Sequence, residues 1–257
     1  MPDPATYDFS QPTLLASVMA LSALAFLVLH ELVRRRLAHS EAPRFHVALK
    51  ISRLWASAVL VAIGIVAILE FGHLWPRAFI AEHPVDSWLR PFNAFLLGHL
   101  LADLVWLGWG RWKFGSEPRI DLIAHHLLGI GAVATAFAFD QGYAVLAVAM
   151  TTEMMPVTTG IIAWARLRGD RGLERKGYRA SLAVSLFWRL PLWLLVLVVV
   201  SRNALVITEP SERLLYQVCI PIALALVALD SIWVRHFLHT LDSFDEVEEP
   251  LPLEEPP

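Results

Sequence analysis

Long apolar runs separated by short polar segments dominate the sequence. Each run approaches the roughly 20 residues that a helix needs to cross the hydrocarbon core of a bilayer, and the alternating pattern of barrel strands is absent. The pattern therefore predicts an all-α, polytopic membrane bundle of about seven transmembrane helices. The expected spans are 13–33, 54–71, 91–109, 120–139, 143–165, 180–200 and 214–238.

This pattern divides the chain into three segments. Residues 1–11 are polar, residues 12–240 form the transmembrane helical domain, and residues 241–257 are acidic and rich in proline. An acidic, proline-rich segment cannot bury enough apolar surface to fold, so we expect the last segment to be disordered. The longest connection, 73–90, contains two tryptophans and two prolines, which favours a position at the membrane surface.

Lysine and arginine are shared unevenly between the connections. The loops that follow the first, third and fifth spans are basic, whereas the other three connections contain only four arginines between them. The positive-inside rule then places the basic loops and the C-terminus in the cytoplasm and the N-terminus outside. The expected location is an integral, multi-pass position in a bacterial inner membrane, or in the endoplasmic reticulum of a eukaryote.

The composition agrees with this interpretation. The 257 residues are 56% hydrophobic and the mean hydropathy is +0.55. The N-terminus lacks the basic residues of a signal peptide, so we expect the first span to be retained. Cys219 is the only cysteine, which excludes an intrachain disulfide.

Five of the seven spans carry ionisable residues well away from their ends. Each costs about 2.5–3.5 kcal/mol near the bilayer centre on insertion scales, so a helix that only spans the membrane avoids them. Their positions place them in the cytoplasmic half or at the midplane, and this shared depth indicates a cavity that opens to the cytoplasm. They are His99 and Asp103 on the third span, Asp121, His125 and His126 on the fourth, Glu153 on the fifth, Arg189 on the sixth and Asp230 on the seventh.

The adjacent histidines of the fourth span are the strongest candidates for chemistry. Asp121 precedes His125 by four residues, so its carboxylate is expected to reach the imidazole and set its tautomer. His99 and Asp103 repeat this spacing on the third span. His126 points about 100° away from His125, so one ring can face the cavity while the other packs laterally.

Two features near the midplane also allow a purely structural interpretation. Arg189 and Glu153 can form a buried ion pair instead of binding a substrate. Pro156 lacks the N–H that would bond to the carbonyl of Thr152, so this carbonyl is free for another donor. Pro191 has the same effect close to Arg189.

Four landmarks, the last of them made of two segments, follow one another between about Phe95 and His239. The segment "LLGHLLADLVWLG" is a small-residue helix that bears an aspartate, and "DLIAHHLLGIG" bears the twin histidine. The segment "MTTEMMPVTTG" combines glutamate, threonine and proline, and "LFWRLPLW" and "ALDSIWVRHFL" supply an Arg/Pro helix and a Trp-bearing last helix. In order and spacing this set resembles the TLC-domain family of membrane proteins, which includes the ceramide synthases.

The resemblance implies a TLC-like core over about 45–240 and a role in lipid metabolism. The chain departs from ceramide synthases in three ways. Gly129 and Ile130 follow the histidine pair in place of a threonine, the fifth span carries Glu153 in place of a later aspartate-rich segment, and no homeobox-like insert is present. The resemblance therefore implies a lipid-related role more directly than it implies ceramide synthesis.

Together with the polar positions, the resemblance favours an acyl-CoA-dependent acyltransferase. A neutral imidazole of His125 or His126 can act as a base or as a transient nucleophile toward a thioester. Asp121 would orient His125, and Asp103 would hold a partner or the acceptor. The acceptor would be a long-chain amine or alcohol, and the apolar interior of the bundle would hold the acyl chain.

The remaining polar residues are expected to bind substrate. Arg189 would stabilise an oxyanion, and the basic loops, including Arg166 and Arg168, would hold the phosphates of CoA. No metal and no cofactor besides acyl-CoA as co-substrate is expected. The expected substrate-binding residues are Glu153, Arg189, His99, Asp230, Arg111 and Lys113.

Other function classes remain open at this stage. A non-enzymatic protein would use the same cavity to bind or sense lipids or to regulate membrane composition. A metal or haem centre needs three or more ligands, and His99, His125 and His126 lack the spacing of oxygenase histidine boxes. A retinal receptor is disfavoured because the seventh span has no lysine. Membrane lipids are expected partners, nucleic acid is not, and a homodimer stays open.

Overall fold

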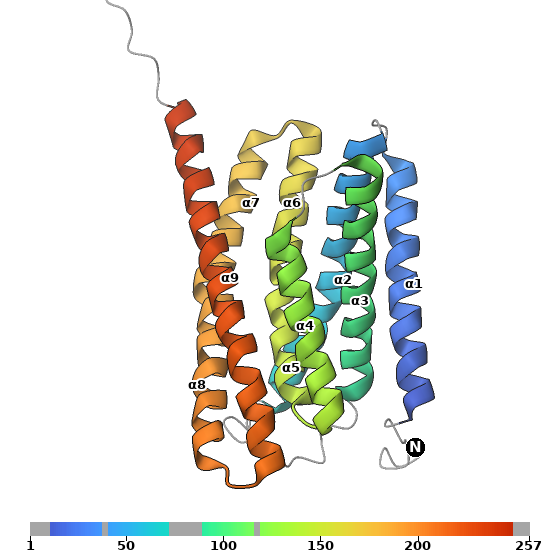
Figure 1. Cartoon of the computed structure of the whole chain (residues 1–257). Helices are drawn as coiled ribbons and strands as arrows, with labels where there is room; N and C mark the ends of the chain where they lie inside the picture. The colour runs from blue at the N-terminus through green and yellow to red at the C-terminus, as the bar shows by residue number, and fades with distance from the viewer. Residues whose placement is uncertain (1–10, 38–40, 72–88, 116–118, 249–257) are drawn as a thin grey trace, which may run out of the picture.

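The computed structural model describes residues 11–37, 41–71, 89–115 and 119–248. Within these residues the chain is helical and has no strand, and seven helices are long and apolar enough to cross a membrane. The predicted all-α polytopic bundle is therefore confirmed (Figure 1). The elements are α1 (Pro12–Arg36), α2 (Glu41–Phe71), α3 (Arg90–Phe114), α4 (Ile120–Phe139), α5 (Tyr143–Ala149), η5 (Met150–Glu153), α6 (Met154–Arg168), α7 (Arg171–Val184), η6 (Ser185–Arg189), α8 (Leu190–Val206) and α9 (Pro210–Glu248).

Two of the crossings are interrupted at their polar residues. The fifth passes from α5 through the 3-10 turn η5 into α6, and the turn ends at Glu153. The sixth passes from α7 through the π-helical turn η6 into α8, and this turn ends at Arg189. Pro191 in the first turn of α8 has no N–H to donate, and this accounts for the change of hydrogen-bond register.

Most helices extend beyond the predicted spans, and three do so by nine or more residues at one end. α2 begins at Glu41, α7 at Arg171, and α9 continues to Glu248. The prediction of disorder is therefore wrong for residues 242–248, because Phe244 on α9 packs against Tyr178 on α7. The rest of that tail, 249–257, and most of the 73–90 connection lie outside the described residues.

The helix that carries the twin histidine lies inside the bundle. α4 contacts α3 on one side and α9 on the other, while α1 lies at one edge and packs on α2 and α3 (Figure 1). α2 packs against α6, and α8 against α9. Residues on α2, α3, α6 and α9 can therefore all reach the neighbourhood of α4.

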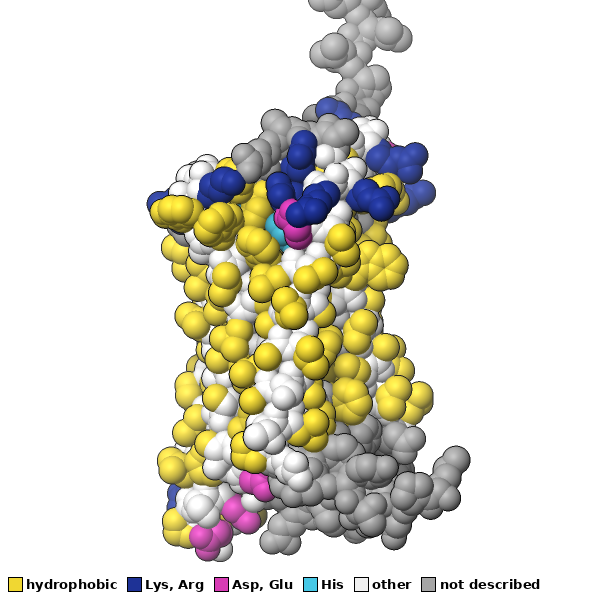
Figure 2. Space-filling view, turned by 90° about the vertical axis from the view of Figure 1, so that its right-hand side faces the viewer, with side chains coloured by type: hydrophobic (Ala, Val, Ile, Leu, Met, Phe, Trp, Pro, Cys, Tyr) yellow, Lys and Arg dark blue, Asp and Glu magenta, His cyan; other side chains and the backbone are white. Residues whose placement is uncertain are grey.

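Charge and apolar surface separate along the bundle. Lys and Arg gather at one end, and hydrophobic side chains cover the middle (Figure 2). We call this the basic end; α1 and α3 finish there with Arg34, Arg35, Arg36, Arg111 and Lys113, and α6 finishes there with Arg166 and Arg168. The first residues of α1 and the last residues of α9 lie at opposite ends of the bundle (Figure 1), as an odd number of crossings requires. Which end faces the cytoplasm stays a prediction from the basic loops.

Close backbone contact joins α1 to α3. A Cβ atom at Gly98 would collide with the carbonyl oxygen of Met19, so only glycine permits this approach. Helices in membranes associate through such small residues because lipid gives no hydrophobic drive for them to associate. Gly108 on the same helix faces open space.

We predict that Gly98→Ala destabilises the bundle, whereas Gly108→Ala does not. The collision at position 98 should cost about 1–3 kcal/mol, the usual range for overpacking. At position 108 alanine should instead add up to about 1 kcal/mol through its helix propensity. Thermal unfolding of the two variants in detergent measures the difference, and equal stability would contradict the contact between α1 and α3.

Candidate functional site

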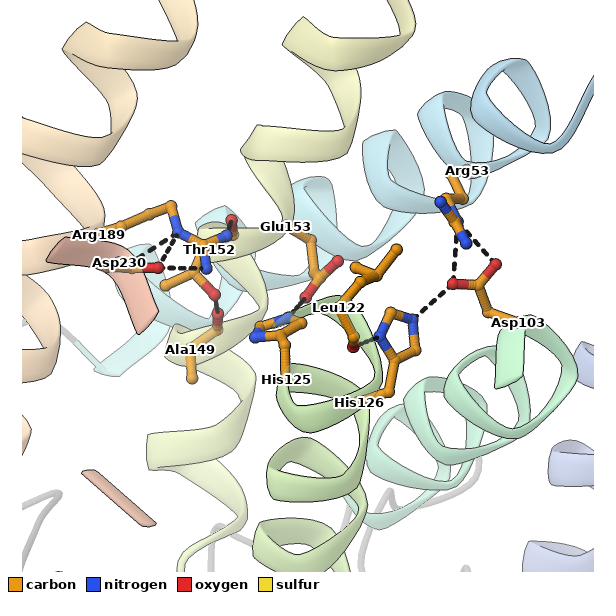
Figure 3. Close-up of polar contacts among 10 residues, drawn as sticks. All are labelled: Arg53, Asp103, Leu122, His125, His126, Ala149, Thr152, Glu153, Arg189 and Asp230. Atoms are coloured by element: carbon orange, nitrogen blue, oxygen red, sulfur yellow. Dashed lines mark hydrogen bonds and ion pairs between the residues drawn. The ribbon is translucent and has the colours of Figure 1, made fainter. Parts of the chain in front are cut away.

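The polar residues of five crossings meet at one level of the bundle. Figure 3 shows side chains from α3, α4, η5, η6 and α9 directed toward one another, together with an arginine from α2. The predicted convergence of intramembrane polar residues is therefore confirmed. They form two hydrogen-bonded groups with His125 between them, which are described in turn below.

His126 belongs to the first group. Its Nε2 lies 2.6 Å from Oδ2 of Asp103, and its Nδ1 lies 2.7 Å from the carbonyl oxygen of Leu122. Both ring nitrogens of His126 are therefore engaged by neighbouring oxygens. Arg53 donates from Nε to both oxygens of Asp103, at 2.7 and 2.9 Å. The three side chains thus link α2, α3 and α4.

Arg189 and Asp230 form the second group. The guanidinium donates from Nη2 to Oδ1 of Asp230 at 2.9 Å and from Nη1 to the carbonyl of Thr152 at 2.6 Å. Both side chains are only 1% exposed. The prediction that Pro156 leaves the Thr152 carbonyl for another donor is borne out, because Arg189 uses it. The alternative of an Arg189–Glu153 pair is wrong, since Asp230 is the carboxylate that faces the guanidinium.

His125 lies between the two groups (Figure 3). Its Nε2 is 3.5 Å from Oε1 of Glu153, and both side chains are about one-tenth exposed. Its Nδ1 is buried and has no hydrogen-bond partner in the described part of the chain. The ring packs on the indole of Trp233 at a centroid distance of 5.4 Å. Of the two histidines, His125 is therefore the one with an uncommitted ring nitrogen.

The prediction that Asp121 orients His125 is wrong. Asp121 accepts from Arg119 at 3.0 and 2.8 Å and from Nε1 of Trp233 at 2.9 Å. The i,i+4 spacing permitted a contact between Asp121 and His125, but Arg119 and Trp233 together donate three hydrogen bonds to this carboxylate. The bond to Asp121 also raises the pKa of the Arg119 guanidinium, which stays charged at the mouth of the site.

The predicted pairing of His99 with Asp103 is also wrong. His99 is buried, its Nδ1 has no partner among the described residues, and its ring packs edge-on against Phe26 at 4.7 Å. Asp103 is engaged by Arg53 and His126 instead. His99 still lines the same cavity as the histidine pair.

Two cavities meet at His125. The polar chamber has a volume of about 200 Å³ and is lined by charged and aromatic residues, among them Lys50, Arg53, His99, Asp103, Arg119, His126, Arg166, Tyr178, Arg189, Trp233 and His236. The apolar chamber has a volume of about 140 Å³ and is lined mainly by aliphatic residues, among them Leu96, Leu100, Gly129, Ala132, Val145, Val196, Val200, Cys219, Ala223 and Leu226. His125 and Glu153 line both chambers.

Arg111 and Lys113 are not brought to this site. Lys113 lines a separate cavity of about 320 Å³ between α1, α2 and α3, together with His30 and Trp106, and Arg111 is exposed. The cations that line the polar chamber near its mouth are Lys50, Arg53, Arg119 and Arg166. Lys50, Arg53 and Arg119 were not among the predicted site residues. The first two precede residue 54, where the predicted second span began, and were expected at the lipid headgroups. Lys50 and Arg53 lie three residues apart, so a longer second helix would have placed both on one face, and this spacing was the signal in the sequence.

Among the described residues, no set of three or more His, Cys, Asp or Glu is arranged to hold a metal ion. The basic and acidic side chains of the chamber are committed mainly to one another. His99 and His125 each have a ring nitrogen without a partner among the described residues, but only His125 also lines the apolar chamber. Its position suits a base or nucleophile acting on an amphipathic molecule.

Comparison of the chain with protein-family models, curated proteins and solved structures finds no match in any of the three. The resemblance to the TLC-domain family therefore stays a prediction, which rests on the order and spacing of the four landmarks. The site has to be interpreted from its own geometry.

We predict that Asp230→Ala strongly destabilises the bundle. The substitution leaves the Arg189 guanidinium buried without its carboxylate, which typically costs about 3–5 kcal/mol. Ser231→Ala, at the adjacent exposed position, is the matched control and should cost less than about 0.5 kcal/mol. Thermal or denaturant unfolding in detergent measures both.

The double variant Arg189→Met/Asp230→Leu tests the cause. Removing both charges together should recover most of the stability lost in Asp230→Ala, because no unpaired charge is left in the core. If Asp230→Ala unfolds at the same temperature as Ser231→Ala, the ion pair does not hold α8 and α9 together.

Proposed function

We propose that the protein is an acyltransferase that moves a long acyl chain from acyl-CoA to a long-chain amine or alcohol within the membrane. The observation that supports this most is the position of His125, which lines the polar and the apolar chamber at once. An acyl thioester has the same division into a polar carrier and an apolar chain. Its carbonyl carbon would lie where the two chambers meet.

His125 and Glu153 would carry the reaction. The carboxylate of Glu153 accepts a hydrogen bond from Nε2–H of His125. The lone pair of Nδ1 is then left for the substrate. In the nucleophilic route Nδ1 attacks the thioester carbon, the C–S bond breaks, and the proton from Nε2 passes by way of Glu153 to the thiolate of CoA. The acceptor then attacks the acyl-imidazole, the C–N bond breaks, and the proton of the acceptor returns to the imidazole.

A simpler route uses the same residues. His125 would take the proton of the acceptor while the acceptor attacks the thioester carbon directly; the C–S bond then breaks, the imidazolium returns this proton to the thiolate of CoA, and no acyl-enzyme forms. In both routes His126 is a positioning residue, because Asp103 and the Leu122 carbonyl occupy its two nitrogens. The ring centroids of the two histidines are 5.7 Å apart, so His126 would position His125 from the side.

A second candidate function is lipid binding without chemistry. The ion pairs Arg53–Asp103 and Arg189–Asp230 are complete within the protein, as expected for groups that only shape a cavity. A lipid could then place its headgroup in the polar chamber and one chain in the apolar chamber. The assay below separates this function from acyl transfer.

We predict that His125→Ala abolishes turnover, whereas His126→Ala only slows it. Purified protein is incubated with palmitoyl-CoA and a long-chain amine or alcohol, and free CoA is measured. Loss of the base or nucleophile should lower the rate at least about 100-fold. His239→Ala, which removes an exposed histidine of α9, is the control and should retain the wild-type rate.

Mass spectrometry of the same samples distinguishes the routes. A hydroxylamine-labile palmitoyl adduct on His125, present in His126→Ala and absent in His125→Ala, would establish the acyl-imidazole. Turnover without an adduct would favour the direct route. If wild-type protein binds palmitoyl-CoA but releases no CoA with any acceptor tried, lipid binding replaces acyl transfer.

We also predict that Ala132→Phe shortens the preferred acyl chain. Ala132 lines the apolar chamber on the same face of α4 as His125, so a phenyl ring there should exclude long chains. Ala134→Phe adds the same ring on the exposed side of α4 and is the matched control. Rates with acyl-CoA of different lengths measure the shift, and an unchanged profile in Ala132→Phe would place the chain elsewhere.

A further inference from the structure

Lys50 is a charge in the polar chamber that no described carboxylate balances. The four arginines that line the chamber each have one: Arg53 pairs with Asp103, Arg119 with Asp121, Arg166 with Glu174 and Arg189 with Asp230. Lys50 makes no such contact in the described part of the chain, and the charges that act on it are guanidiniums of Arg53, Arg119 and Arg166. A half-buried ammonium among three cations is unfavourable unless an anion joins them.

Arg53 also has an unused donor. Its Nε bonds to Asp103, but its Nη2 is buried and has no acceptor within the described residues. Lys50 precedes Arg53 by three residues on α2, so both side chains lie on the same face of the helix. A buried donor without an acceptor costs free energy, and a bound oxyanion would recover it.

The chamber opens where such an anion would arrive. It lies toward the basic end of the bundle and includes Arg119 and Arg166, which begin and end helices at that end. His125 lies five residues into α4, about 8 Å from the start of the helix at 1.5 Å per residue. An anion held near the mouth would therefore leave the rest of its molecule extending toward His125.

We infer that the polar chamber is a phosphate-binding site in which Lys50 and Nη2 of Arg53 hold a phosphate group of the substrate. This deepens the proposed function and rests on it, because it names the chemistry that delivers the acyl chain to His125. A phosphate can come from the CoA carrier or from a phospholipid headgroup, and the chemistry that recognises it is the same. The site differs from the loop residues Arg111 and Lys113 expected from the sequence.

Binding of matched ligand pairs tests the inference on the purified full-length protein in detergent. Palmitoyl-CoA is paired with the palmitoyl thioester of N-acetylcysteamine, and palmitoyl lysophosphatidic acid is paired with monopalmitoylglycerol. In each pair only one ligand has phosphate. The variant Lys50→Met removes the charge and keeps an unbranched side chain that is one atom shorter, and Lys176→Met makes the same change at an exposed position of the basic end.

The expected result is a loss confined to one phosphate ligand. Lys50→Met should weaken its binding roughly tenfold or more, the usual effect of losing a charge-assisted hydrogen bond, and should leave the phosphate-free partner within about twofold. Lys50→Arg should retain the affinity, which guards against a general loss of folding. The pair that responds identifies the source, CoA or phospholipid. Lys176→Met should change neither pair.

The inference is overturned if Lys50→Met binds both phosphate ligands as tightly as wild type, or loses the phosphate-free ligands equally. Failure of the proposed function has a different signature. Wild-type protein would then show phosphate binding that depends on Lys50 but release no CoA. Conversely, if Lys50→Met binds both phosphate ligands as tightly as wild type and releases CoA at the wild-type rate, the phosphate site is removed and acyl transfer still stands.

Discussion

The structure depends on the pairing of its buried charges, because an unpaired charge is strongly unfavourable in the apolar interior of a membrane bundle. Arg53, Asp103 and His126 form one group, and Arg189 and Asp230 form the other. Each charge has an opposite charge and hydrogen bonds within reach, which offsets the desolvation that burial demands. Because the partners come from different helices, the pairs also fix the positions of α2, α3, α4, α8 and α9 around the cavity.

This pairing explains why one histidine of the adjacent pair is available and the other is not. His126 is held at both nitrogens by Asp103 and the Leu122 carbonyl. His125, about 100° further around α4, meets only Glu153 at 3.5 Å and keeps Nδ1 uncommitted. The framework thus fixes α4 through one ring and presents the other to two chambers of opposite polarity. A reaction at the boundary between a polar carrier and an acyl chain is the use that fits this division best.

The sequence predicted which residues converge better than it predicted which residues pair. Asp103, Glu153, Arg189 and Asp230 could be placed near the histidines because the cost of burying charge in a bilayer leaves them few other positions. Their partners could not be derived from i,i+4 spacing. Asp121 accepts a hydrogen bond from Trp233, which lies more than a hundred positions away in the sequence. Asp103 accepts one from Arg53 on α2. The predicted last helix was too short for a similar reason, because the packing of Phe244 on Tyr178 extends α9 past the apolar run.

Photolabelling tests the central claim, that an acyl chain enters the apolar chamber from His125, most directly. A palmitoyl-CoA analogue with a diazirine at the end of the chain is bound to the purified protein, irradiated, and the labelled residues are identified by mass spectrometry. The account predicts labels on chamber residues such as Val145, Val200 and Cys219. Labels confined to the exposed apolar surface, for example at Val198 or Leu224, would contradict it.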